Sequence, residues 1–194
     1  MKKLIVATSN PGKVQEMQEY LIDTQWELQL KPREIEIEET GKTFLENACL
    51  KASQVAKIMK EWAIADDSGL AVDSLDGAPG VYSARYAPND EARISRLLQE
   101  LEGVSNRKAK FVCALAIARP DGSIASQTEG ICLGEIMMKP RGQNGFGYDP
   151  IFYVPEVRLT FAQMESRLKN KLSHRGKAFQ QLSRSLRDNQ SLDN

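Results

Sequence analysis

The chain has 194 residues, of which 41% are hydrophobic and 27% charged, with 26 basic and 26 acidic side chains. This length suits one domain, or one domain with a lobe, and allows a substantial buried core. The balanced charge gives no extended field for nucleic acid or a membrane surface. No apolar segment is long enough to span a bilayer, and the run at residues 4–7 is too short for a signal peptide.

The three cysteines are far apart in the sequence and have no CxxC spacing. Each lies in an apolar stretch, so we expect reduced core cysteines, typical of a reducing compartment. The expected location is therefore cytoplasmic.

The first apolar run, residues 3–7, predicts a β-strand, and the apolar spacing that follows residue 13 predicts a helix. Asn10 is a suitable N-cap for this helix, and Pro11 is a suitable first helical residue. We expect the free backbone amides of Gly12 and Lys13, beside the Lys13 ammonium, to bind an anion at the helix N-terminus. An ordinary strand–cap–helix connection explains these residues equally well, and the P-loop pattern is absent.

A second strand is predicted at residues 26–30, and the segment after it ends in an acidic cluster that includes Glu39. Thr43 and Glu46 have capping-box spacing and predict a helix that runs to about residue 60. Glu38 and Glu39 therefore lie just before a helix, on a loop held by Gly41, where a carboxylate could reach a metal ion near Asp66 and Asp67. Acidic runs are, however, more often solvated surfaces.

An apolar run at residues 62–65 ends in two adjacent carboxylates, Asp66 and Asp67. This pattern predicts a buried strand that delivers both to its C-terminal edge, where ligands bind in open α/β sheets. Neighbouring side chains in a strand point to opposite faces, so one carboxylate should face the ligand and the other should take a structural partner. Two solvated acids at a strand end explain the same residues.

The second half of the chain predicts an antiparallel pair of strands at residues 109–118 and 124–138, joined by a turn, so the sheet should be mixed. A helix should begin after Asn89 and end at Gly103. The glycine-rich stretch 139–149 is typical of a functional loop. At the C-terminal end we expect a helix capped by Thr160 and running to about Leu172, a helix capped by Ser173 with Phe179, Leu182 and Leu186 inward, and a frayed tail at 188–194.

These segments together predict a site for a nucleoside triphosphate. Lys13 suits phosphates, and the carboxylates at Glu38/Glu39 and Asp66/Asp67 suit Mg²⁺, which prefers oxygen ligands and often shares them with substrate phosphates. The aromatic residues at 146 and 148 could stack on a base. A Ser-His-Asp hydrolase is not expected, because His174 is the only histidine and the chain has no GxSxG sequence. A transition-metal site is not expected without histidine or cysteine pairs.

Six segments resemble those of the inosine triphosphate pyrophosphatase family, which includes the bacterial dITP/XTP pyrophosphatases. They occur in the family order, cover nearly the whole chain and are highly specific together. The segments are ATSNPGK at 7–13, ETGxTFxENA at 39–48, DDSGL at 66–70, GAPGxYSARY at 77–86, GFGYDP at 145–150 and SHRGKA at 173–178.

The resemblance implies a single domain, residues 1–194, of the α/β class: an elongated mixed β-sheet with flanking helices and two lobes around a central cleft, usually as a homodimer. It also implies Mg²⁺-dependent hydrolysis of non-standard purine nucleotides (ITP, dITP, XTP) to the monophosphate and pyrophosphate, which cleanses the nucleotide pool. No nucleic-acid or membrane partner is expected.

The resemblance further implies roles for individual residues. Asp67 matches the proton acceptor and an Mg²⁺ ligand, Glu39 matches a second metal ligand, and Ser68 contacts the substrate. Two positions depart from the family pattern: Ser9 stands where many members have glycine, and Arg167 and Leu168 precede Lys169 where acidic residues are common. The implied phosphate-binding residues are Thr8, Ser9, Asn10, Pro11, Gly12 and Lys13, and the base and sugar are surrounded by Phe146, Gly147, Tyr148, Asp149, Lys169, His174 and Arg175.

We infer attack of water on the α-phosphate, with Asp67 orienting or deprotonating the water and Lys13 neutralising charge on the triphosphate. A 6-keto purine offers an acceptor that Lys169 or Arg175 can meet, whereas adenine offers a donor. Two other interpretations remain open, a nucleotide-binding regulatory module without chemistry and a phosphatase acting on monophosphates. A pyrophosphate-release assay separates all three.

Overall fold

The structure, a computed structural model, describes the backbone of residues 2–21 and 26–188 and the burial of side chains up to Ser183. Of the expected tail at 188–194, Asp188 is described as the last residue of a helix, whereas residues 189–194 and the inward position of Leu186 lie outside these described parts. The chain forms two compact units. Unit 1 consists of Met1–Asp67, Cys113–Gly130 and Arg175–Asn194, and unit 2 consists of Ser68–Val112 and Ile131–His174.

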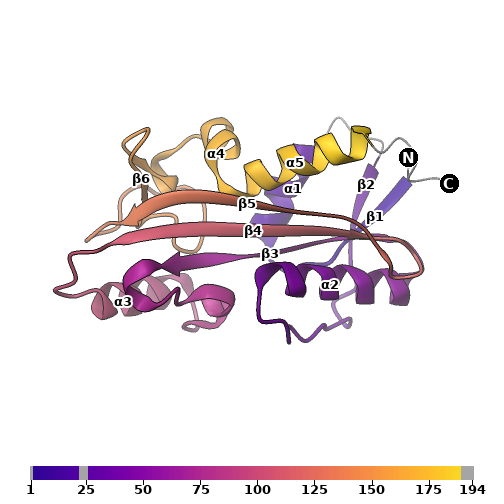
Figure 1. Ribbon diagram of the computed structural model, residues 1–194, viewed down its shortest axis with the longest axis horizontal. Helices are drawn as coiled ribbons and strands as arrows, with labels where there is room; N and C mark the ends of the chain where they lie inside the picture. The colour runs from indigo at the N-terminus through magenta and orange to yellow at the C-terminus, as the bar shows by residue number, and fades with distance from the viewer. Residues whose placement is uncertain (1, 22–25, 189–194) are drawn as a thin grey trace. The chain divides into compact units, whose positions relative to one another are not determined.

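Within the described residues, seven strands form one sheet in the order β2-β1-β3-β4-β5-β6-β7 (Figure 1). The β1 strand pairs in parallel with β2 and β3, whereas β6 is antiparallel to both β5 and β7, which confirms the expected mixed sheet. The strands are β1 Lys2–Val6, β2 Trp26–Leu30, β3 Trp62–Val72, β4 Lys108–Ala118, β5 Ile124–Ile136, β6 Phe152–Val154 and β7 Leu159–Thr160.

Five α-helices accompany the sheet in the described residues, and short 3₁₀ turns occur at Asp73–Leu75, Gly80–Arg85 and Phe161–Gln163. No described helix is long and apolar enough to cross a membrane. The helices are α1 Pro11–Leu21, α2 Phe44–Met59, α3 Asp90–Glu100, α4 Ser166–Leu172 and α5 His174–Asp188.

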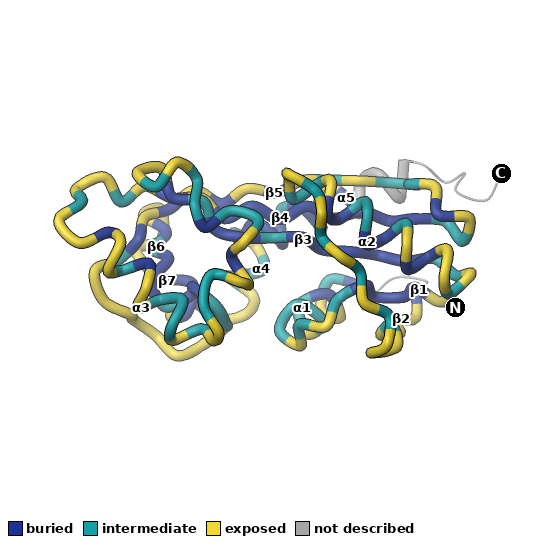
Figure 2. Tube along the Cα trace, turned by 90° about the horizontal axis from the view of Figure 1, so that it is seen from below, coloured by how far each residue is buried: buried dark blue, intermediate teal, exposed yellow. Residues whose placement is uncertain are grey.

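Unit 1 is layered, because alternate residues of its buried strands pack on opposite faces. Leu4 and Ile64 belong to a core cluster with residues of α1 and α5. Ile5 and Ala65 belong to a second cluster with α2. Figure 1 accordingly shows α2 on one side of these strands and α1 and α5 on the other. Figure 2 shows β1 and β3 as mostly buried, whereas β2 is mostly exposed.

Polar caps fix the start of several helices, as the sequence predicts. The Thr43 hydroxyl accepts a hydrogen bond from the Glu46 amide, and the Glu46 carboxylate accepts one from the Thr43 amide. The capping box of α2 is therefore confirmed. Asn89 likewise caps α3 by accepting from the Ala92 amide at 2.8 Å. These bonds satisfy backbone donors that the first helical turn leaves without partners.

The expected helix from Thr160 to Leu172 is wrong. Thr160 caps only the 3₁₀ turn Phe161–Gln163, and α4 begins separately at Ser166 after extended backbone at Met164 and Glu165. Ser173 is the C-cap of α4, directly before α5. The capping signal was correctly identified, but its hydrogen bonds close a single turn, which does not continue into the next helix.

The core of unit 2 is aromatic. Phe111 packs edge-on against Phe152 at a ring distance of 4.6 Å and stacks on Phe161 at 5.6 Å. All three rings are buried, together with residues of α3 and β5. Tyr148, near the end of the glycine-rich segment, belongs to this core.

Candidate functional site

Asp66 and Asp67 lie inside β3 rather than at its end, because β3 continues to Val72. The predicted strand end is therefore wrong. The parallel neighbour β1 does stop at Val6, which pairs with Ile64. The two carboxylates consequently lie just beyond the carboxyl end of the parallel part of the sheet, the edge at which ligands bind in α/β folds.

The strand directs the two carboxylates to opposite faces, as predicted. Asp66 is fully buried and contacts residues of α1 and α5, whereas Asp67 contacts residues of α2. The same alternation separates Ile64 from Ala65 in the two core clusters. Asp66 thus pairs with Lys13 and Arg175, whereas Asp67 on the other face contacts Asn47 and Lys51.

Asp66 is the centre of a buried charge network. Its Oδ1 lies 2.5 Å from Lys13 Nζ, and its Oδ2 accepts from Arg175 Nε at 2.7 Å and from Cys113 Sγ at 3.1 Å. Arg175 also donates from Nη1 to Glu16 of α1. Although burial opposes it, the charges of Arg175 and Lys13 hold the pKa of Asp66 well below its usual value. Burial and the nearby Asp66 raise the pKa of the Cys113 thiol, so this cysteine is an inert core thiol.

Asp67 belongs to a second network that also contains Glu39. Lys51 Nζ lies 2.6 Å from Glu39 Oε1 and 3.0 Å from Asp67 Oδ1, so one ammonium joins the two carboxylates. Asn47 Nδ2 donates to the other oxygen of Asp67 at 3.2 Å. Burial raises the pKa of Asp67, with Lys51 and Lys13 opposing the shift. The two carboxylates therefore converge from separate segments, as the sequence analysis expects of a metal site.

This donor set fits Mg²⁺. Magnesium is usually held by one or two protein carboxylates, with water and substrate phosphates filling the other positions. Among the described residues no group of three or more His, Cys, Asp or Glu side chains could hold a metal alone. A cation between Glu39 and Asp67 would therefore complete its coordination with oxygen atoms of water or of the substrate.

The loop before α1 differs from expectation in one respect. The amides of Gly12 and Lys13 are not free for an anion, because they donate to Asn10 Oδ1 at 2.9 and 3.3 Å. Thr8 Oγ1 accepts from the Asn10 amide at 3.2 Å and so helps to fix the cap. The cap that the sequence predicts uses the same donors that the predicted anion site requires. Ser9 and Pro11 are exposed at this surface, whereas the Lys13 ammonium is turned to the buried Asp66.

The glycine-rich loop of unit 2 surrounds a second buried ion pair. Lys169 Nζ lies 2.7 Å from Asp149 Oδ2, which also accepts from the Phe146 amide at 2.9 Å. The ammonium lies 5.0 Å from the centre of the Phe146 ring. Gly145 has a φ of +76°, and a Cβ at this position would collide with Asp149 Oδ2. Glycine therefore permits the close approach that brings Phe146, Asp149 and Lys169 together.

The structure also describes the other predicted site residues of unit 2. His174 stacks on Phe111 at 4.6 Å, with only 10° between the ring planes. Tyr148 is buried and donates its hydroxyl to the Ser83 carbonyl at 3.0 Å, so it is positioned as a packing residue rather than an open stacking platform. Gly147 donates its amide to Asp90 at 2.7 Å, and Ser68 is partly buried in β3.

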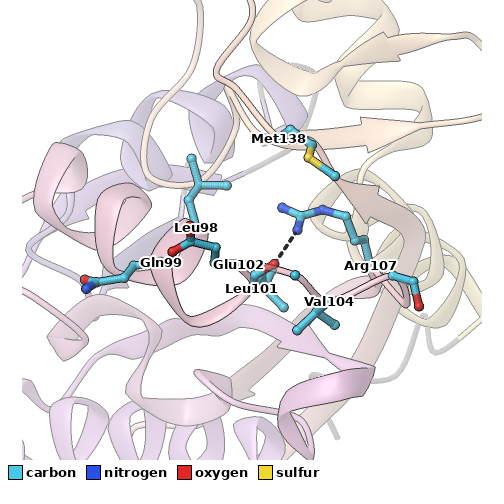
Figure 3. A pocket seen from close by; sticks show the side chains of 9 residues that line it. Leu98, Gln99, Leu101, Glu102, Val104, Arg107 and Met138 are labelled. Carbon is cyan, nitrogen blue, oxygen red and sulfur yellow. Dashed lines mark hydrogen bonds between the residues drawn. The ribbon is translucent and has the colours of Figure 1, made fainter.

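Unit 2 also has a cavity of about 530 Å³ that lies apart from the predicted residues (Figure 3). It is formed by the end of α3, the segment that follows it, and Met138. Arg107 donates to the carbonyls of Leu101, Ile136 and Met137, so its guanidinium fastens backbone rather than facing a ligand. None of the predicted site residues lines this cavity.

Sequence reasoning missed Lys51, Asn47, Glu16 and Cys113. The signal for Lys51 was present, since it lies four residues after Asn47 in a helix whose other inward residues are apolar, and such pairs share a helix face. A charged residue on an apolar helix face indicates a buried partner. No comparable pattern marks Glu16 or Cys113.

The mixed sheet and its helices define an α/β protein, with carboxylate–lysine pairs at Asp66, Asp67 and Asp149. The sequence pattern of the Ham1 family matches residues 4–185, and the chain belongs to this family. A dITP/XTP pyrophosphatase of Nostoc sp. is 67% identical over 178 residues, covering 92% of this chain and 91% of the relative. A dITP/XTP pyrophosphatase of Synechocystis sp. is 65% identical over 182 residues, covering 94% of each chain.

Solved structures agree with this assignment. A HAM1 protein from Coxiella burnetii superposes with a TM-score of 0.88 at 43% identity, covering 97% of this chain and all of the other. The Staphylococcus aureus Ham1 protein gives a TM-score of 0.87 at 40% identity with the same coverage.

Proposed function

We propose that the chain is an Mg²⁺-dependent nucleoside-triphosphate pyrophosphatase that converts ITP, dITP and XTP to monophosphates and pyrophosphate. The convergence of Glu39 and Asp67 on one cation, Lys51 Nζ, carries this proposal. The names of the Nostoc and Synechocystis relatives support the substrate class.

The proposed chemistry uses Asp67 as the residue that orients water and accepts its proton at the α-phosphate. Burial raises the pKa of Asp67 in the absence of a metal ion. Glu39 and Asp67 would hold Mg²⁺, which supplies charge neutralisation for the triphosphate. Lys13, held by Asp66, adds a fixed positive charge for the phosphates, and fixed charges need no reorganisation during the reaction.

For the base, we propose that Lys169 meets the 6-keto group while Phe146 stacks on the purine ring. Asp149 fixes the Lys169 ammonium at 2.7 Å, so the donor is oriented before substrate arrives. Adenine would present an amino donor to this cation, and a site built on such a hydrogen bond rejects the mismatch by ~10⁴-fold. Arg175, whose guanidinium is bound by Asp66 and Glu16, is proposed to act by positioning the start of α5.

Product identity tests the reaction type. We expect ITP and Mg²⁺ to yield inosine monophosphate and pyrophosphate, with no orthophosphate and no hydrolysis of the monophosphate. Release of orthophosphate would instead support a phosphatase, and tight ITP binding without turnover would support a regulatory module.

A single functional domain over residues 1–194, a homodimer and a cytoplasmic location complete the proposal. The relatives cover more than nine tenths of the chain, which supports the single domain. The homodimer rests on the family resemblance, and light scattering at working concentrations tests it directly: a monomeric mass would contradict it.

A further inference from the structure

Lys51 is a cation placed between the two carboxylates that the proposed function assigns to Mg²⁺. Its Nζ lies 2.6 Å from Glu39 Oε1 and 3.0 Å from Asp67 Oδ1, and its side chain is only 11% exposed. Two carboxylates held this close repel each other unless a positive charge lies between them. The ammonium therefore supplies the charge that brings Glu39 and Asp67 together.

A divalent cation held between these carboxylates would lie against Lys51 Nζ, which contacts one oxygen of each. Glu39 Oε1 and Asp67 Oδ1 both face Lys51 Nζ, and Asn47 already donates to Asp67 Oδ2. The site therefore offers the shared oxygens to one cation at a time. The two cations also repel each other at contact distance, which adds to their competition.

We infer that Lys51 is an internal competitor of the metal: divalent-cation binding displaces its ammonium from Glu39 and Asp67 and makes it available to the substrate's phosphates. This inference rests on the proposed function. It predicts that metal and triphosphate strengthen each other's binding, because the first releases a positive charge that the second needs. It also gives Lys51 a role without metal, which is to keep the two carboxylates in place.

Metal binding without nucleotide tests the competition. The probe is Mn²⁺, followed by electron paramagnetic resonance, on the full chain. Lys51→Met removes the ammonium and keeps an apolar side chain on α2. If pairing with Lys51 leaves only about a tenth of the molecules ready to bind, the variant should bind Mn²⁺ ~10-fold more tightly.

Two matched variants separate displacement from a general charge effect. Lys57→Met alters an exposed lysine of the same helix and should leave Mn²⁺ affinity unchanged. Lys13→Met removes an ammonium whose charge reaches Asp67 but which pairs with Asp66, and should tighten binding by clearly less than Lys51→Met. Equal gains in Lys13→Met and Lys51→Met, or no gain in Lys51→Met, would overturn the inference.

Glu39→Gln distinguishes failure of this inference from failure of the metal site itself. The substitution should abolish Mn²⁺ binding, because it removes one of the two shared carboxylates. Unaltered binding would place the metal elsewhere and would overturn both the inference and the metal part of the proposed function. Loss of binding in Glu39→Gln without a gain in Lys51→Met would overturn the inference alone.

A stability readout covers the case in which Lys51→Met folds poorly. Lys51→Gln keeps a hydrogen-bond donor but removes the charge, and should show the same tighter Mn²⁺ binding. In either variant Mg²⁺ should raise the melting temperature by more than it does in the wild type, because binding no longer displaces a native ion pair. An equal or smaller rise would contradict the displacement.

Discussion

Asp66 and Asp67 have different partners although they are adjacent, because a strand turns consecutive side chains to opposite faces. Asp67 faces Lys51, Asn47 and the neighbouring Glu39, and burial raises its pKa. Asp66 faces Lys13 and Arg175. The alternation divides the pair into a group suited to proton transfer and a group suited to holding cations.

Asp67→Asn should abolish turnover while the protein stays folded. The amide keeps the shape of the side chain but can neither accept a proton nor bind metal strongly, and loss of a general base costs about 10²- to 10⁴-fold in rate. Pyrophosphate release from ITP, with circular dichroism as the folding control, measures both effects. Normal hydrolysis of ITP by Asp67→Asn at saturating Mg²⁺ would show that Asp67 is not the proton acceptor.

Asp66→Asn should mainly reduce stability. It leaves Lys13 and the buried Arg175 without their shared counter-charge, and breaking a buried pair in this way costs ~3–5 kcal/mol. Urea unfolding measures the loss, and Asp73→Asn, at an exposed aspartate, is the control that should change little. Equal stability of both variants would show that the network is not stabilising.

The same network should make stability sensitive to acid. The folded-state pKa of Asp66 is lowered from 3.8, so its contribution is present above that value and is lost as the pH falls toward the folded-state pKa. The unfolding free energy of the wild type, measured from about pH 6 down to about pH 3, should therefore fall more steeply than that of Asp66→Asn. Parallel profiles would assign the acid sensitivity to other groups.

At the scale of elements, α2 connects a local sequence signal to the site. Its capping box fixes where the helix begins, and the helix then presents Asn47 and Lys51 toward Asp67. Gly41, just before the cap, donates its amide to Asn47 Oδ1 at 2.8 Å, so the loop that carries Glu39 is fastened to the same helix.

Thr43→Ala should therefore cost about 1 kcal/mol of stability through loss of the cap. It should also weaken metal binding, since the first turn of α2 orients Asn47. Thr43→Ser retains the hydroxyl and should restore both properties. Thermal unfolding and Mn²⁺ titration measure the two effects, and an unchanged melting temperature in Thr43→Ala would contradict the role of the cap.

The glycine-rich loop provides a second test at this scale. Gly145→Ala should raise the KM for ITP by ~10-fold or more, because the new methyl group displaces Asp149 from the Phe146 amide and Lys169, and a loss of ~1.4 kcal/mol is tenfold in binding. Gly77→Ala is the matched control. It also has a positive φ, +85°, but its Cβ would meet nothing within 4 Å. An equal rise in KM in Gly145→Ala and Gly77→Ala would mean that backbone strain, and not the collision with Asp149, causes the effect.

At the scale of the whole molecule, the sequence predicts most elements but not their partners. The strand at Trp26–Leu30 and the capped starts of α2 and α3 follow from local patterns that are independent of distant contacts. The continuation of β3 beyond Asp67 was missed, since Ser68 and Gly69 resemble a strand end. Only pairing within the folded sheet makes this segment extended, and such pairing is not encoded locally.

The candidate site was predictable to a similar degree. The resemblance supplied Glu39 and Asp67, and the structure brings them onto one ammonium. The ammonium itself, Lys51, and the Asp66–Arg175 pair join segments far apart in the chain. Such contacts follow from tertiary packing, which sequence spacing does not specify.

The rate of pyrophosphate release from a panel of ITP, dITP, XTP and ATP with Mg²⁺ tests the account most directly. We expect hydrolysis of ITP, dITP and XTP to exceed that of ATP by ~10⁴-fold, because a fixed Lys169 ammonium meets a 6-keto group but not an amino group. Comparable rates for ITP and ATP, or no pyrophosphate from any nucleotide, would contradict it.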